Sequence, residues 1–366
     1  MAKIVIDARE SGTSTGRYID KLLEHMGALN PKHDITVLVK PHRLDFMMKT
    51  TPNFTVQTTP YKEFTFGEQL GFWRQVRSFK ADMVHFGKDH QPVLYKGRVV
   101  TTMHDLTTAR FRNPDKHPLV FGIKQVVYLW VVRRVAKKSN AILTPTEFVK
   151  NDVVKFTHIN PNKVTVTYEA TEPIAEEAEP LNSLLGKLFI MYVGRPTPHK
   201  NLARLIDAFK ILQKQNPELR LVLAGKKDAN YQAHADRVKR EGIKNVIFTD
   251  FITDGQLRWL LENCTAYIFP SLSEGFGLPG LEAMLQGAPV VSSNATCLPE
   301  VYGDAAYYFD PTDVMDMAEK INEVINNAKL RQELSAKGKK QAAKYSWRRM
   351  AEQTLAVYEA TLRQKL

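Results

Sequence analysis

The chain has 366 residues, enough for two domains or three at roughly 150 residues each, and its 43% of hydrophobic residues excludes a disordered protein. Its 51 Lys and Arg residues outnumber its 39 Asp and Glu residues, and the formal charge of +12 favours anionic partners such as nucleic acid, acidic lipid headgroups or phosphorylated small molecules. The longest apolar run, Val126 to Val132, is too short for a membrane-spanning helix of about 20 residues, and two cysteines cannot build a disulfide framework, so a cytoplasmic location is expected.

Short β-branched runs alternate with helical patterns in the first half of the chain, where the first helix is predicted to begin near Gly16. Strands are predicted at Lys3–Ala8, Ile35–Val39, Asp82–Phe86, Arg98–Met103, Ala141–Leu143 and Lys163–Tyr168. The alternation stops in an acidic, proline-containing stretch after Tyr168, which has the composition of a linker.

The same alternation begins again in the second half. Strands are predicted at Leu188–Val193, Arg220–Ala224, Asn245–Thr249, Ala266–Phe269, Pro289–Ser292 and Ala306–Phe309. Helices are predicted to begin near Asn201, Ala229, Asp254 and Pro279. The end of the chain has a helical pattern that is interrupted near Ser346.

This alternation predicts an α/β fold of two Rossmann-like domains, each a parallel sheet covered by helices on both faces. We expect a first domain over residues 1–170, a linker over 171–186, a second domain over 187–345 and a final helix over 346–366. Because ligands of open α/β sheets bind at the carboxyl ends of the strands, the expected site is a cleft between the two domains.

The most informative motif follows the predicted strand Ala266–Phe269 and runs from Glu274 through Gly275-Phe-Gly-Leu-Pro to Glu282. Its glycines permit a tight loop, and a proline in the first turn of a helix is favourable, so the segment predicts an anion site with Glu282 in that first turn. Carboxylates beside such a site suit the hydroxyl groups of a sugar. The alternative is a tight turn followed by a helix that its glutamate stabilises.

A second motif ends the first strand after the linker with Gly194-Arg195 and opens the next helix after Lys200. Two cations at a strand end and a helix start can neutralise a diphosphate without a metal ion. The alternative is a pair of ordinary surface cations. A third motif places His104 at the end of a first-domain strand, where the alternatives are a ligand contact and a structural histidine.

These three motifs together resemble the family 4 retaining glycosyltransferases, which have the two-domain GT-B fold. The resemblance implies that Glu274 and His104 lie against the donor sugar, that Arg195 and Lys200 hold the diphosphate, and that Glu282 holds the ribose. It also implies backbone contacts to the donor from Gly194, Phe276, Gly277 and Leu278. The family's final helix crosses back to the first domain.

The sequence departs from the family pattern at two loops. Thr15 stands before Gly16 where many relatives have a double glycine, so the acceptor side is assigned to Gly16 and Arg17. Asp250 stands where relatives often have glycine, and the base pocket is assigned to the following residues Phe251 and Ile252.

The segment Pro118–Lys138 combines an apolar centre with cations and contains no acidic residue. One interpretation is a helix that lies on an anionic membrane surface. The other, which its apolar circumference favours, is a core helix of the first domain with a basic end. The cations concerned are Lys124, Arg133, Arg134, Lys137 and Lys138.

The resemblance implies a metal-independent, retaining hexosyltransferase without a cofactor, which uses a nucleoside-diphosphate sugar and a glycan or lipid-linked acceptor. GDP-mannose is slightly favoured as donor, and a peripheral position at the inner face of a membrane is considered. The alternatives are a sugar-nucleotide epimerase of the same fold, an inactive sugar-binding relative, and a nucleic-acid-binding protein; no module for nucleic acid is found.

Overall fold

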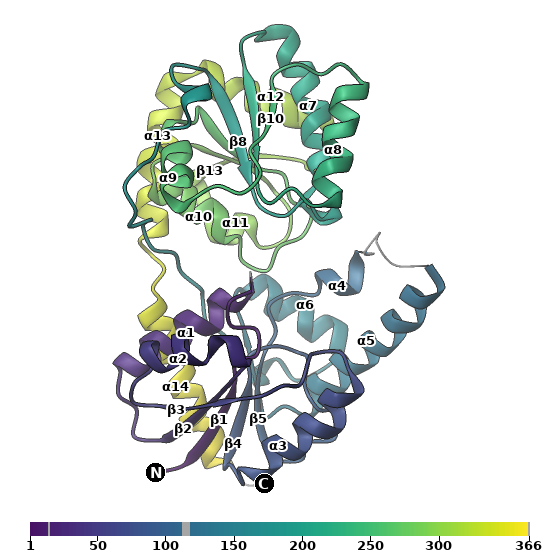
Figure 1. Ribbon diagram of the computed structural model, residues 1–366, viewed down its shortest axis with the longest axis vertical. Coiled ribbons are helices and arrows are strands. Elements are labelled where there is room, and N and C mark those ends of the chain that lie inside the picture. Colours follow the sequence, from purple (N-terminus) through teal and green to yellow (C-terminus); the bar gives the residue numbers. More distant parts are fainter. Residues whose placement is uncertain (14, 112–117, 365–366) are drawn as a thin grey trace. The chain divides into compact units, whose positions relative to one another are not determined.

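A computed structural model describes residues 1–13, 15–111 and 118–364 (Figure 1). The described residues form two compact units, the first made of residues 1–110, 118–169 and 346–364 and the second of residues 111 and 170–345. Each unit is an α/β layer structure, which confirms the predicted fold class of two Rossmann-like domains. No helix among the described residues is long and apolar enough to span a membrane.

The first unit is built on a parallel sheet with the strand order β3-β2-β1-β4-β5-β6-β7. Chain order reverses between the neighbours β1 and β4, so Ile4 faces Ile35 on one side and Met83 on the other. The strands are β1 (Lys3–Asp7), β2 (Asp34–Val39), β3 (Thr55–Thr58), β4 (Met83–Phe86), β5 (Arg98–Thr102), β6 (Ala141–Thr144) and β7 (Val164–Val166). The reversal leaves a crevice at the carboxyl ends of β1 and β4, where such sheets bind ligands.

Helices of the first unit connect and cover these strands. Thr146 begins one of them by accepting a hydrogen bond at Oγ1 from the Val149 amide at 3.1 Å, and His158 ends it in the left-handed conformation. The helices are α1 (Gly16–Ala28), α2 (Leu44–Thr50), α3 (Trp73–Ser78), α4 (Thr107–Arg110), α5 (Pro118–Lys138), α6 (Glu147–Thr157) and α14 (Trp347–Arg363). Shorter helical turns are η1 (Pro41–Arg43), the π-turn η2 (Glu68–Phe72) and η3 (Pro161–Lys163).

The second unit repeats the plan with the strand order β10-β9-β8-β11-β12-β13, all parallel where paired. Here the chain order reverses between β8 and β11. The strands are β8 (Phe189–Val193), β9 (Arg220–Ala224), β10 (Val246–Phe248), β11 (Ala266–Phe269), β12 (Val290–Ser293) and β13 (Ala306–Phe309). The helices are α7 (Leu202–Gln215), α8 (Ala229–Arg240), α9 (Asp254–Asn263), α10 (Leu278–Leu285), α11 (Leu298–Tyr302), α12 (Val314–Asn326) and α13 (Ala328–Ala342), with short turns at η4 (Asn182–Leu184), η5 (Pro198–Lys200) and η6 (Gly303–Ala305).

The last helix, α14, packs in the first unit although the chain reaches it from α13 of the second, which confirms the predicted crossing. Ser346 caps it by accepting from the Arg349 amide at 3.3 Å. Tyr358 then fixes it to β4, because its buried hydroxyl lies 2.5 Å from Nδ1 of His85.

The acidic segment expected as a linker is held on α9 of the second unit. The Glu179 amide donates to the Gly255 carbonyl at 3.0 Å, and the Thr253 hydroxyl donates to the Glu179 carboxylate at 2.9 Å. Arg258 donates to the Glu176 carbonyl at 3.0 Å. These bonds make the segment part of one unit rather than a free tether.

From Gln125 on, where its side chains are described, helix α5 is buried on one face, which corrects the expectation that its apolar circumference would be enclosed. Tyr128, Val132, Val135 and Ala136 pack into the core beneath β5 and β6. The opposite face is open to solvent: Val126, Val127 and Trp130 are 68%, 55% and 56% exposed, and Arg133, Arg134 and Lys137 are also exposed.

Candidate active site

The loops that carry the donor motifs meet where the second sheet reverses its order. Gly194 and Arg195 follow β8 directly, and the glycine loop that contains Glu274 follows β11. Since β8 and β11 are hydrogen-bonded neighbours, the fold brings both loops to the same edge of the sheet. Lys200 and Glu274, which form an ion pair between these loops, are 74 residues apart in sequence, so only the sheet topology brings them together.

The central contact of this site is an ion pair between Lys200 and Glu274. Lys200 Nζ donates to Glu274 Oε1 at 2.6 Å, and the two side chains are 19% and 12% exposed. The backbone at Glu274 is fixed by its amide, which donates to the Thr296 hydroxyl at 3.1 Å. Lys200 also lies 5.6 Å from the centre of the Phe269 ring. Two residues selected from separate motifs are thus in direct contact and remain accessible.

The glycines of both loops occupy conformations that other residues rarely adopt. Gly194 has φ of +143° and Gly277 has φ of +96°. At Gly277 a β-carbon would also lie 2.5 Å from the Tyr302 hydroxyl oxygen, which donates to the Gly277 carbonyl at 2.6 Å. Gly277 immediately precedes α10, and the helix start places the positive end of the helix dipole at the loop.

Other predicted donor residues lie on the same elements with different exposures. Arg195 is exposed, Phe276 is buried and Leu278 begins α10. Glu282 is half-buried and is the fifth residue of α10, which corrects the expectation that it stands in the first turn. The helix begins at Leu278, with Pro279 second, so the glutamate falls one turn further along.

Asp250 explains how the loop after β10, where the sequence departs from the family pattern, keeps its shape without glycine. It adopts φ of +62°, and its carboxylate accepts a hydrogen bond from the Lys227 amide at 2.8 Å. Aspartate tolerates this left-handed region because its short side chain bonds locally to the backbone. Phe251 is 78% exposed and Ile252 half-buried, and both follow β10, which β9 separates from β8.

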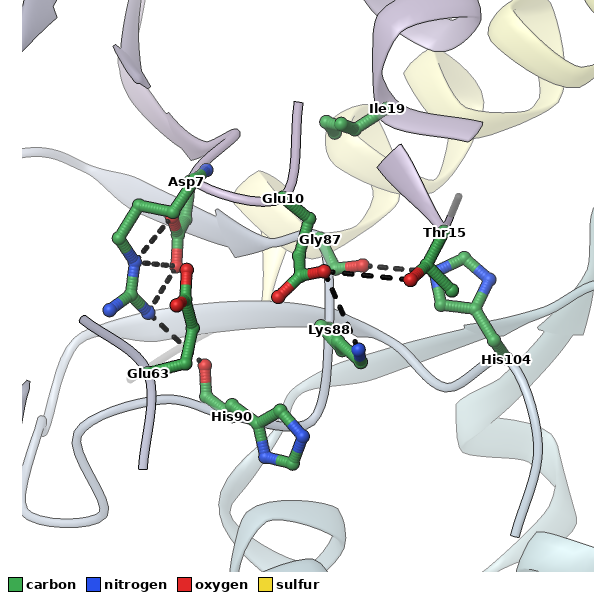
Figure 2. Close-up of a pocket in the computed structure, with 10 residues that line it drawn as sticks. Asp7, Glu10, Thr15, Ile19, Glu63, Gly87, Lys88, His90 and His104 are labelled. Atoms are coloured by element: carbon green, nitrogen blue, oxygen red, sulfur yellow. Dashed lines mark hydrogen bonds and ion pairs between the residues drawn. The ribbon is translucent and has the colours of Figure 1, made fainter. Parts of the chain in front are cut away.

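The first unit has a pocket at the crevice between β1 and β4 (Figure 2). His104, the predicted first-domain site residue, lines it from the end of β5. The other lining residues are Asp7, Arg9, Glu10, Thr15, Ile19, Glu63, Gly87, Lys88 and His90. Their side chains supply three carboxylates and two permanent cations around one opening.

His104 is held on both ring nitrogens and on one ring edge. Its Nδ1 lies 3.3 Å from Glu169 Oε1, its Nε2 lies 3.1 Å from the Gly87 carbonyl oxygen, and the Tyr18 ring meets it edge-on at 4.7 Å. Burial disfavours the charged imidazole, but the hydrogen bond to Glu169 and its charge outweigh burial, so the pKa of His104 is raised.

Sequence reasoning missed the ionic wall of this pocket. Arg9 is 2% exposed and donates to Asp7 and to Glu68, each at 2.8 Å. Lys88 lies 3.6 Å from Glu10 on the opposite wall, as Figure 2 shows. Burial disfavours the charged form of Glu10, yet Lys88 and a hydroxyl hydrogen bond lower its pKa, so it stays ionised. In the sequence, only the position of these residues after β1 and β4 could have indicated that they line the pocket.

The residues assigned to the acceptor side have separate places. Gly16 is the buried first residue of α1, and a β-carbon there would lie 1.9 Å from the Glu10 carbonyl oxygen, so the glycine permits a close approach of backbone to backbone. Arg17 is exposed on the same helix and does not line the pocket. Among the described residues, no cluster of three or more His, Cys, Asp or Glu side chains could hold a metal ion.

Comparison with known proteins now gives the class. Residues 15–173 match the family model described as Glycosyltransferase Family 4, and residues 174–341 match the model described as Glycosyl transferases group 1. The chain therefore belongs to the family 4 glycosyltransferases of the GT-B fold, and it is a glycosyltransferase.

Individual relatives make the comparison more specific. The chain is 29% identical to O-antigen chain mannosyltransferase B of Escherichia coli over 74% of its own length and 75% of that protein. It is 34% identical to the serotype-specific mannosyltransferase WbdA of Escherichia coli over 58% of its length, but this matches only 28% of that longer protein.

Solved structures agree on the fold. A sucrose-phosphate synthase from Thermosynechococcus elongatus superimposes with a TM-score of 0.79 at 15% identity, covering 98% of this chain and 99% of that one. Anabaena HepE, solved in complex with UDP and glucose, superimposes with a TM-score of 0.74 at 16% identity, covering 98% of this chain and 100% of that one.

Proposed function

We propose that this glycosyltransferase is a retaining hexosyltransferase that moves a sugar from a nucleoside-diphosphate donor to a glycan or lipid-linked acceptor. The observation that carries the proposal is the accessible Lys200–Glu274 ion pair at the point where the second sheet reverses its order. A cation for phosphate and a carboxylate for sugar hydroxyls stand within one hydrogen bond of each other.

In the proposed complex the diphosphate lies against Lys200, Arg195 and the start of α10. Glu274 accepts hydrogen bonds from the transferred sugar, and Glu282 accepts from the ribose. Lys200 already neutralises Glu274 in the free protein. In the proposed complex, the two phosphate groups of the donor replace Glu274 as the anionic partners of this lysine. Phe251 and Ile252 receive the base in this proposal, with Gly194, Phe276, Gly277 and Leu278 supplying close backbone contact.

Transfer with retention needs the new bond to form on the face that the leaving group vacates. The bond between the anomeric carbon and the diphosphate oxygen breaks, and the electron pair goes to the diphosphate. The acceptor oxygen forms the new bond to the anomeric carbon, and its proton passes to the departing diphosphate. Arg195 and Lys200 stabilise the charge that develops there, so no metal ion is needed.

The names of the matched relatives favour mannose as the transferred sugar. O-antigen chain mannosyltransferase B and WbdA are both named for it, and GDP-mannose is the donor that we place first. HepE was solved with UDP and glucose, but at 16% identity it supports the fold and not the base.

The acceptor is proposed to enter at the pocket of the first unit, which Thr15 lines directly before Gly16 and Arg17 in the chain. The cations of this pocket already face carboxylates, since Arg9 pairs with Asp7 and Lys88 with Glu10. A pocket with compensated charge suits the hydroxyl groups of a glycan end better than a bare phosphate. We therefore place the reacting sugar hydroxyl here, whether or not a lipid follows it.

The experiment is a transfer assay preceded by a thermal-shift panel of GDP-mannose, UDP-glucose, UDP-galactose and free diphosphates. A true donor at 100 times its dissociation constant adds about 2.7 kcal/mol of stability, which the melting temperature reports. Proton NMR of the product shows whether the anomeric configuration is kept. Incubation with donor alone tests for an epimerase, which would convert the sugar without an acceptor.

The same assay is repeated after treatment with a chelator and dialysis. We expect unchanged turnover because Arg195 and Lys200 replace the metal. A complete loss of turnover that magnesium or manganese restores would overturn this part of the proposal.

A further inference from the structure

His104 stands between two hydrogen-bond acceptors, and this decides its protonation. Nδ1 faces the Glu169 carboxylate at 3.3 Å, and Nε2 faces the Gly87 carbonyl oxygen at 3.1 Å. A neutral imidazole has one N–H and one lone pair, so it satisfies only one of these partners. The imidazolium donates to both. The geometry thus favours a ring that carries two protons and one positive charge.

Glu169 reaches the ring from another part of the first unit. His104 follows β5, and Glu169 follows β7, so both side chains come from the carboxyl edge of the same sheet. Glu169 is 6% exposed and is the last residue of the first unit before the chain enters the second. A buried carboxylate in contact with a ring is an effective partner for its charge because little water screens the pair.

Glu10, another carboxylate of the pocket, faces Lys88 at 3.6 Å, and the remaining groups near the ring either oppose its charge or are uncharged. Lys88 lies across the pocket and disfavours a second cation. Tyr18 presents a ring edge, and its hydroxyl bonds to Thr102 at 2.9 Å. His85 bonds to the same Thr102 hydroxyl at 2.9 Å and is neutral in the fold, because burial lowers its pKa to about 3. Glu169 is therefore the one carboxylate among these neighbours that stabilises the charged ring.

We propose that Glu169 is a positioning residue that holds His104 as an imidazolium, with both N–H groups fixed, at the site of glycosyl transfer. His104 then contributes a fixed positive charge to the pocket and does not accept the acceptor's proton. This deepens the proposed function and rests on it. It agrees with the step in which that proton passes to the diphosphate.

The protonation is tested directly on the full-length protein without substrate. Histidine labelled with ¹⁵N is followed by long-range proton–nitrogen correlation between pH 5 and 9, and the His104 signal is identified by its loss in His104→Gln. We expect an imidazolium signal at neutral pH. In Glu169→Gln the midpoint should fall by about one pH unit or more, a tenfold change in proton affinity. Glu169→Asp should restore most of the shift.

A matched control is available in the same unit. Glu359 lies 3.0 Å from His33 on the surface, so Glu359→Gln removes another carboxylate from a histidine without touching the pocket. Its His104 signal should be unchanged. A neutral His104 ring in the unmodified protein at pH 7, or equal His104 midpoints in Glu169→Gln and the unmodified protein, would overturn the proposal.

The functional readout is the pH profile of transfer with the donor found above. We expect turnover to fall on the alkaline side as His104 loses its proton, and this limb should move to lower pH in Glu169→Gln. A uniform loss at every pH would mean that Glu169 only supports the fold, and it contradicts the proposal. If no donor supports transfer, the proposed function fails while the NMR titration still decides the state of His104.

Discussion

Lys200 and Glu274 illustrate how one residue pair can serve both the free protein and the proposed complex. Their 2.6 Å contact is largely but not fully buried. Removing either side chain therefore leaves a largely buried charge without its partner. The diphosphate of a donor is the natural replacement for Glu274 as partner of Lys200. Effects of changing the two residues should therefore depend on one another.

We predict that Lys200→Ala lowers the turnover number by on the order of 100-fold, the cost of removing one charge-stabilising donor at a developing anion. Glu274→Ala should also lower turnover, and the double variant should lose less than the product of the two single losses. Single-turnover kinetics at saturating donor measure all three.

The matched control is Lys210→Ala, which breaks a surface pair with Glu241 in the same unit, 2.9 Å long, and should leave turnover unchanged. Strictly multiplicative losses in the Lys200 and Glu274 variants would show that the two side chains act independently, contrary to this prediction.

Glu282 should act on donor affinity rather than on turnover. In the proposed complex its carboxylate accepts from the ribose, and a hydrogen bond to a charged group contributes about 1.5–3 kcal/mol. Glu282→Ala should weaken donor binding by that amount, measured by calorimetric titration with the nucleotide sugar. Equal dissociation constants for the variant and the unmodified protein would remove Glu282 from the ribose site.

At the level of single residues, the motifs predicted which residues of the second unit lie together better than they predicted the walls of the first unit's pocket. Glu274 and Lys200 lie in compact motifs whose residues the sheet edge brings together. The pocket of the first unit depends on contacts such as that between Arg9 and Glu68, 59 residues apart, with Glu68 in a π-turn that no periodicity predicts. The depth of Glu282 in its helix depended on where α10 begins, and such boundaries are uncertain by a residue or more.

Among the elements, buried strands were predictable and the exposed edge strand was not. The predicted strand Arg220–Ala224 agrees with β9, whose residues from Leu221 on are fully buried. β3 was missed, because Thr55–Thr58 lies at the sheet edge, three of its four residues are exposed and three are polar, whereas the edge strand β10 is apolar and half-buried and was predicted. A strand that buries neither face has no apolar period to detect. The acidic segment had the composition of a linker, but its bonds to α9 come from a distant part of the sequence.

The contact between β4 and α14 makes stability depend on pH. His85 is fully buried against Tyr358 and Thr102, and burial lowers its pKa to about 3. In the unfolded chain its pKa is near the ordinary 6.5, so between these values the unfolded state binds the extra proton. The contribution of neutral His85 to the free energy of unfolding is therefore fully present above pH 6.5. It declines as the pH falls, by at most about 1.4 kcal/mol per pH unit.

We predict that His85→Gln lowers the melting temperature at pH 7.5, because two buried hydrogen bonds are lost. It should also make the further decline between pH 6.5 and 4.5 shallower than in the unmodified protein. Calorimetry of both proteins across this range gives the comparison. Parallel curves would mean that His85 does not titrate with unfolding.

For the whole molecule, the formal charge of +12 exceeds what a nucleotide sugar requires. One place where exposed cations adjoin exposed apolar side chains is the outer face of α5. Val126, Val127 and Trp130 stand on the same face as Arg134 and Lys137. Cations on such a face can contact anionic headgroups while the apolar side chains beside them enter the membrane interface. Lys138 does not belong to it, because its ammonium donates to the Pro92 carbonyl at 2.5 Å and burial lowers its pKa to about 7. The side chain of Lys124 lies outside the described residues.

The last prediction is that α5 binds anionic membranes reversibly. Each cation near such a surface contributes about 1 kcal/mol, so Arg134→Ala with Lys137→Ala should weaken partitioning by about 2 kcal/mol, and Trp130→Ala should weaken it further. Lys239→Ala with Arg240→Ala removes the same charge from α8 of the second unit and is the control. Co-sedimentation with liposomes of rising anionic content, at low and high salt, measures the effect. Equal pelleting with neutral and anionic vesicles, or equal losses in the two double variants, would contradict binding through α5. Binding through this face would place the first unit, which carries the proposed acceptor pocket, at the membrane, where lipid-linked acceptors are found. No pelleting would favour a soluble glycan.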